Sequence, residues 1–221
     1  IRKIRIYNKL KMDITSIIFI TLKISVLSTI ISFVTSVLLS IFVLRYNKFT
    51  FIIDVITTLP LALPPVITGY FIIYITNGYL AFDWIGGSIA CSIISLPLVY
   101  RTIFVSVNSI DKSMINTSRI LGANKIQTLI LVILPSIKVG IISSIFLGFI
   151  RSISEFGATM IVSGNISGKT QTISTGIYTS IQNGDNNNLI ILSSWSIFLA
   201  LLTIIIFTFI RRKQNIKSLY E

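Results

Sequence analysis

The feature of this sequence that most limits its fold is a series of long apolar runs. Several of them exceed the roughly 20 residues that a helix needs to cross the hydrocarbon core of a bilayer. Hydrophobic residues occupy 53% of the 221 positions and charged residues only 12%, about half the share typical of soluble domains. We therefore expect an all-α fold: a polytopic membrane bundle of about five transmembrane helices over residues 14–212, with no separate soluble domain. The expected crossings are residues 14–43, 51–75, 88–107, 134–162 and 189–210.

Lysine and arginine give the chain a net charge of +12, which by itself would suit a nucleic-acid partner. These residues cluster beside the apolar runs, as the positive-inside rule describes, so we expect a lipid bilayer around the chain and no nucleic acid. Basic clusters follow the first crossing, the third crossing and the fifth crossing. We therefore expect a multi-pass cell-membrane protein whose C-terminal tail, residues 213–221, lies in the cytoplasm and whose N-terminus lies outside.

The basic segment at residues 1–13 opposes this orientation, because it carries five positive charges. Three explanations are open: the segment is not native sequence, a crossing that precedes it is missing, or the positive-inside rule fails locally. We favour the first two explanations, because three basic regions agree with one another and only one disagrees.

Several classes of function lack the residues they need. The chain has one cysteine and no histidine, so neither an internal disulfide nor a metal site is expected. Residues 164–170 suggest a phosphate-binding loop, but three residues separate its glycines where the motif requires four. Without histidine or a pair of membrane aspartates we find no catalytic constellation, so we expect a non-enzymatic chain without a cofactor.

The second crossing contains an unusual proline segment. Pro60, Pro64 and Pro65 each remove a backbone donor, so the helix must kink or break there, and Gly69 follows. Irregular backbone is tolerated in a membrane only against protein or a water-filled cavity. These four residues are therefore candidates for a transport pathway; the alternative is a bend with no role in transport.

Arg151 and Glu155 are the second candidate feature. On a helix, residues four apart share one face, and pairing lowers the cost of placing both charges at membrane depth. One interpretation is a structural salt bridge. The other is a gate element, in which the pair orders Phe156 beside the pathway and Gly157 permits a bend.

A polar, basic segment at residues 108–127 separates the third and fourth crossings. Met114, Ile115, Ser118, Leu121 and Gly122 fall near one helical face, with the basic residues elsewhere. Such a segment is most simply a surface for a soluble partner, and Gly122 either lets a partner backbone approach or ends the helix. The alternative is an amphipathic helix that lies on anionic lipid.

Residues 116–123, followed by residues 132–135, resemble the permease signature of prokaryotic ATP-binding-cassette (ABC) importers. That signature reads E-A-A, three residues, G, nine residues, I-x-L-P. Gly122 and Leu134-Pro135 keep its spacing, whereas Asn116 stands at the acidic position. Residues 59–69 and 151–159 further resemble molybdate-type permeases, and sulfate and tungstate permeases share much of this resemblance.

The resemblance implies a homodimer that moves an oxyanion along its axis by alternating access, with molybdate favoured and sulfate or tungstate as alternatives. It also implies an external oxyanion-binding protein and a cytoplasmic ATPase that carries the ATP and magnesium. The ATPase would receive a cytoplasmic coupling helix formed by Asn116, Thr117, Ser118, Arg119, Leu121, Gly122 and Ala123. A hypothesis of another class is a stand-alone secondary transporter, for which Glu155 and Asp54 would be the ion-coupling candidates.

Overall fold

The structure is a computed structural model that describes the backbone of residues 13–217 and the side chains of residues 13–212. The charges expected at residues 1–12 and the side chains of the tail at 213–221 lie outside the described residues. Within the described chain every regular element is a helix, which confirms the all-α prediction. The elements are α2 (Ile14–Arg45), η1 (Asn47–Phe49), α3 (Thr50–Ala62), α4 (Pro65–Ile75), α5 (Trp84–Asn108), α6 (Lys112–Ile120), α7 (Lys125–Thr128), the π-helical turn η2 (Leu129–Ile133), α8 (Leu134–Ile153), α9 (Gly157–Val162), α10 (Ile173–Asn183) and α11 (Asn186–Lys217).

Four described helical stretches are long and apolar enough to cross a membrane: Ile14–Arg45, Trp84–Asn108, Lys125–Ile153 and Asn186–Arg212. A fifth candidate is the pair formed by the η1–α3 stretch and α4, bent by 114°. The bend follows from the prolines, because Leu63 precedes Pro64 and is extended, with ψ at 142°. The predicted break in the second crossing is therefore confirmed.

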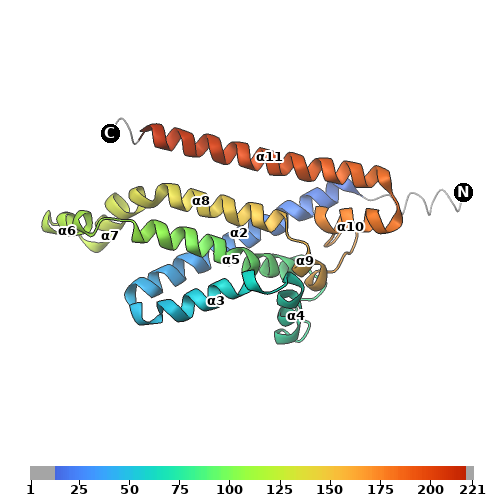
Figure 1. The fold of residues 1–221 in the computed structure, drawn as a ribbon, viewed down its shortest axis with the longest axis horizontal. Coiled ribbons are helices and arrows are strands. Elements are labelled where there is room, and N and C mark those ends of the chain that lie inside the picture. Colours follow the sequence, from blue (N-terminus) through green and yellow to red (C-terminus); the bar gives the residue numbers. More distant parts are fainter. Residues whose placement is uncertain (1–12, 218–221) are drawn as a thin grey trace, which may run out of the picture.

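The long helices run alternately up and down the bundle, so that the connections gather at two ends (Figure 1). One end, which we call the α6 end, holds α6, α7, the turn between α2 and α3, and the end of α11. The other end, the α9 end, holds α4, α9 and α10. The three basic connections singled out in the sequence thus share the α6 end.

Small polar residues hold α2 against the rest of the bundle. Ser25, Ser28, Ser32, Ser36 and Ser40 recur every three or four residues along α2, and all are buried. The Ser28 hydroxyl makes a 2.8 Å hydrogen bond with that of Ser152 on α8. Close approach through small residues and interhelical hydrogen bonds is the usual way in which membrane helices associate, because lipid provides no hydrophobic drive.

The fourth crossing differs from its predicted bounds of 134–162. Its helix begins earlier, at Lys125, and passes through η2 before α8. It also ends earlier, at Ile153, because the chain turns at Ser154 and α9 starts anew at Gly157. The sequence left open whether the helix continues through residues 155–158; the structure shows a break there, and a side chain of the turn, Glu155, caps the new helix.

Candidate coupling and gate sites

The N-terminus of α6 is fixed by Asp111. Its carboxylate accepts a 2.8 Å hydrogen bond from the backbone N–H of Ser113, which otherwise has no partner within the helix. Hydrogen bonds from the Ser113 backbone and side chain lower the pKa of Asp111 below its ordinary value. The cap is therefore ionised at neutral pH, as the positive end of a helix dipole favours.

The C-terminus of α6 is fixed by Gly122, whose φ of +88° lies in the left-handed region. The N–H of Ala123 bonds to the carbonyl of Ser118, and the N–H of Gly122 bonds to that of Arg119, each at 3.0 Å. This pair of bonds is a Schellman motif. Of the two roles predicted for Gly122, the structure confirms that it ends the helix.

Helix α6 projects from the bundle as a largely bare surface, and none of its residues is buried (Figure 1). The exposed fractions of Ile120 and Leu121 are 85% and 81%. The predicted apolar face is divided: Ile115 and Ser118 turn toward the bundle, and the Ser118 hydroxyl lies 3.2 Å from that of Thr128. The other predicted coupling residues are exposed, except half-buried Ala123; they are Asn116, Thr117, Arg119, Leu121 and Gly122.

Ile120 is a surface residue that the sequence analysis missed. The permease signature specifies residues 116–118 and Gly122, and Ile120 lies between these positions. Its isolation from the core becomes visible only once the helix is seen to stand clear of the bundle.

At the α9 end, two glycines bring α4 and α9 into direct contact. A Cβ at Gly69 would lie 3.0 Å from the Cβ of Ile161 and 3.1 Å from the backbone of Ala158. A Cβ at Gly157 would lie 3.1 Å from the Cβ of Pro65. The break after α3 is thus stabilised by the packing of α4 against a segment about 90 residues later in the chain.

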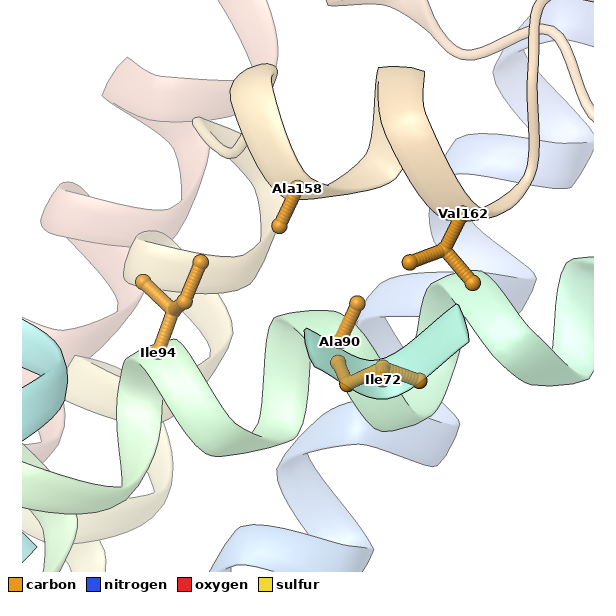
Figure 2. Packing of buried hydrophobic residues seen from close by; sticks show 5 residues of the cluster. All are labelled: Ile72, Ala90, Ile94, Ala158 and Val162. Carbon is orange, nitrogen blue, oxygen red and sulfur yellow. The ribbon is translucent and has the colours of Figure 1, made fainter. Parts of the chain in front are cut away.

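Helix α9 also packs on α5, as Figure 2 shows. Ala158 and Val162 of α9 face Ala90 and Ile94 of α5, with Ile72 of α4 completing the cluster. All five side chains are buried. Helix α9 is therefore a short wedge that contacts both the bent element and a long crossing helix.

Arg151 and Glu155 lead directly into this wedge. The Arg151 Nη1 and Glu155 Oε2 atoms are 2.8 Å apart, and the exposed fraction of Glu155 is 3%. The other carboxylate oxygen accepts a 3.1 Å hydrogen bond from the N–H of Ala158. The predicted pair forms, although Glu155 lies beyond the end of α8 and not on its helical face, so the carboxylate joins the end of one helix to the start of the next.

Two further contacts near this end were not predicted. The ring of Phe156 lies 5.2 Å, centroid to centroid, from that of Tyr178 on α10. The Lys23 ammonium lies 3.6 Å from the centre of the Trp84 ring, a cation–π contact between α2 and α5. Both involve partners more than 20 residues away in the chain, which no local spacing reveals.

The structure separates the predicted residues into two groups. Pro65, Gly69, Arg151, Glu155, Phe156 and Gly157 gather around α9, whereas the coupling residues lie at the opposite end (Figure 1). Pro60 lies inside α3, and Pro64 is exposed at the break. Among the described residues no group of three or more histidines, cysteines or acids could hold a metal ion.

Comparisons with known proteins agree with this arrangement. Residues 32–215 match the family described as binding-protein-dependent transport system inner membrane component. The molybdenum transport system permease protein ModB of Escherichia coli K12 is 33% identical over 176 residues, which cover 73% of this chain and 77% of that protein. ModB of Haemophilus influenzae is 31% identical, with 72% and 76% covered. The sulfate transport system permease protein CysT of Salmonella typhimurium is 29% identical, with 61% and 53% covered.

Solved structures share the fold. An inward-facing form of the MetNI methionine ABC transporter superposes with a TM-score of 0.70 at 15% identity, covering 89% of this chain and 93% of that chain. A bacterial ABC transporter that imports the polysaccharide alginate gives 0.69 at 17% identity, covering 91% and 78%. The chain therefore belongs to the family of binding-protein-dependent transport system inner membrane components: it is a multi-pass permease subunit of an ABC importer, non-catalytic itself, which acts with a separate ATPase and a binding protein.

Proposed function

We propose that this permease imports an oxyanion of the molybdate class, as one half of a homodimer. The observation that carries the proposal is the similarity to two ModB proteins at 31–33% identity over about three quarters of both chains. Sulfate permeases are also similar but match a smaller part of the chain. Tungstate and sulfate are therefore the alternatives to molybdate. Family membership speaks against a stand-alone secondary transporter, and Asp54 accepts a hydrogen bond from Tyr100 as a structural contact between α3 and α5.

The proposed orientation places the α6 end in the cytoplasm. Arg45, Lys48, Lys112, Lys125 and Arg211 all lie in the connections or helix ends at that end of the bundle. A soluble ATPase can reach α6 only from that side. Labelling of Lys112→Cys, Lys125→Cys and Lys169→Cys in intact cells tests this orientation, because the single native cysteine, Cys91, is buried and gives little background.

The expected result is that only Lys169→Cys reacts with a membrane-impermeant reagent, since Lys169 follows α9 at the opposite end. Reaction of the Lys112→Cys or Lys125→Cys variants before the cells are opened would contradict the orientation. It would also remove the basis for ATPase docking at α6.

Helix α6 is the proposed docking element for the ATPase. Its exposed Ile120 and Leu121 provide the apolar contact, and the ends fixed by Asp111 and Gly122 make it rigid. A preformed helix loses little conformational entropy on binding, which favours the complex. Asn116 cannot form the ion pair available to a glutamate at that signature position, but its amide can still donate and accept hydrogen bonds.

The bent element and α9 together form the proposed gate. A glycine contact allows two helices to slide or separate with small changes of side chains, and here Gly69 and Gly157 provide it from both sides. ATP binding to the partner would move α6 with α8, and α8 leads through Arg151 and Glu155 into α9. The ATPase docked on α6 and the gate at α9 would then bias the same two-state equilibrium, which is what coupling between two sites requires.

Reconstitution with the matching ATPase and binding protein tests the substrate. We expect molybdate to stimulate ATP hydrolysis at concentrations at which sulfate does not. Stimulation by sulfate alone would overturn the substrate assignment and leave the family unaffected. Crosslinking of the purified complex of permease and ATPase, with two permease chains per two ATPases as the expected product, tests the homodimer.

A further inference from the structure

A polar cleft of about 460 Å³ opens between α5, α8 and α11 in the half of the bundle that carries α6. Neither the proposed gate nor the docking surface uses it. Its lining combines hydroxyl groups, apolar side chains and one cation: Thr102, Ser106, Ser109, Ser136, Ile137, Val139, Gly140, Ser143, Leu147, Phe207 and Arg211.

Two close contacts position the three helices around the cleft. Gly140 of α8 lies against the Ser106 hydroxyl so closely that a Cβ would collide with it, which holds α5 and α8 together. Helix α11 touches α8 through Phe207 and Phe146, whose ring centres are 5.3 Å apart. The cleft lies beside these two contacts and is lined by the short side chains of Ser136 and Ser143 together with Leu147.

The polar wall offers hydrogen-bond donors without a competing acid. Ser106 and Ser136 donate to backbone carbonyls of their own helices, at 2.7 Å each. Ser143 has no hydrogen-bond partner among the described residues, so its O–H is available to a ligand. Arg211 makes no ion pair within the described chain, and no aspartate or glutamate lines the cleft. A permanently charged guanidinium together with the hydroxyl of Ser143 is suited to the oxygens of a phosphate group.

The apolar residues of the lining favour a lipid phosphate over a free inorganic ion. Leu147 and Phe207 would strip water from a free inorganic oxyanion and give no interaction in return. They suit an acyl chain, and Arg211 lies where the apolar part of α11 ends, at the depth of the headgroups. We propose that the cleft binds one anionic phospholipid, with its phosphate on Arg211 and Ser143 and its acyl chain against Leu147 and Phe207. Basic pockets between membrane helices bind lipid headgroups in this way.

The test uses the purified full-length permease, depleted of lipid in detergent and titrated with phosphatidylglycerol, phosphatidylcholine, inorganic phosphate and molybdate. Native mass spectrometry counts the lipids that remain bound. Arg211→Gln removes the proposed cation, and Arg212→Gln is its matched control, because Arg212 is adjacent and exposed but lies outside the lining. Ser143→Ala removes the free hydroxyl without enlarging the side chain.

We expect one tightly bound phosphatidylglycerol, weakened about tenfold by Arg211→Gln and less by Ser143→Ala, as the loss of one charge-assisted contact predicts. Arg212→Gln should leave the affinity within about twofold. Equal losses in the two arginine variants would overturn the site, since the lipid would then respond only to general surface charge. Displacement of the lipid by inorganic phosphate or molybdate would overturn the lipid assignment and leave a site for a free oxyanion. Neither outcome depends on the substrate of the transporter.

Discussion

Loss of the Glu155 carboxylate should destabilise the α9 end more than loss of both members of its ion pair. Glu155 is nearly inaccessible and lies 2.8 Å from Arg151, whose side chain is 27% exposed. Removing one partner of a buried pair costs about 3–5 kcal/mol, because the remaining charge is left without a counterion. Partial exposure of Arg151 places the expected loss at the lower end, about 3 kcal/mol. Glu155→Ala also removes the acceptor of the Ala158 N–H, for about 1 kcal/mol more.

A double-mutant cycle isolates the pairing from the cap. Glu155→Gln keeps an oxygen that can accept the Ala158 N–H, so its cost reports mainly the stranded guanidinium. The double variant Arg151→Met, Glu155→Gln removes both charges, and we expect it to be more stable than either single variant. The resulting interaction energy should be about 2–3 kcal/mol, the upper part of the range for residues in contact.

The measurement is the free energy of unfolding in mixed detergent micelles, followed by circular dichroism. Asp185→Ala is the control, because the Asp185 carboxylate also caps a helix, through the N–H of Asn188 at 3.1 Å. It forms no salt bridge within the described chain. If Glu155→Gln costs no more than this control, or if the double variant is as unstable as the single one, the two charges do not stabilise each other.

Three further predictions address the proposed sites. Gly122→Trp should abolish co-purification of the ATPase while the permease remains folded. Gly78→Trp is the control and should leave co-purification unchanged, because both glycines have positive φ and open space around a Cβ but lie at opposite ends of the bundle. Gly69→Ala should reduce transport strongly relative to Gly78→Ala, because its Cβ would press on the backbone of Ala158 and overpacking costs about 1–3 kcal/mol. The pKa of Asp111 is lowered in the folded state, so the cap stabilises α6 fully above the ordinary carboxyl range and is lost as pH falls through that lowered pKa. Exchange of the Ser113 amide should accelerate there, and Asp111→Asn should abolish this pH dependence.

The sequence was most informative where a residue imposes its own backbone geometry. The prolines required a break in the second crossing, and the break lies between Leu63 and Pro64. The 114° angle and the position of α4 were not predictable, because they depend on contact with Ala158 and Ile161, residues remote in the chain. Local chemistry determines that the helix ends, and tertiary packing determines where the chain goes next.

The turn at residues 154–156 shows the opposite case. The four-residue spacing of Arg151 and Glu155 correctly predicted the pair, but it placed both residues on one helical face, whereas Glu155 lies beyond the end of α8. Gly157 is a local signal for a bend, but the position of the turn also depends on Glu155, which caps α9, and on the packing of α9 against α4 and α5. The buried serines of α2 recur every three or four residues, and this spacing in the sequence places them on one face of the helix. The high serine content of the first crossing alone does not show that they share a face.

Helix α8 provides the physical connection between the two ends of the molecule. It continues without interruption from α7 and η2 at the α6 end to Arg151 at the α9 end. Close contacts with α2 and α5, through Ser152 and Gly148, oppose bending of its half nearest α9. A displacement at α6 would therefore reach α9 as a shift of the whole helix, and the first irregular backbone that it meets is the turn held by Glu155. In the gate that we propose, the ion pair lies where a rigid-body shift would be converted into a movement of α9 against α4, so the proposal gives the buried Glu155 charge a mechanical role beyond its contribution to stability.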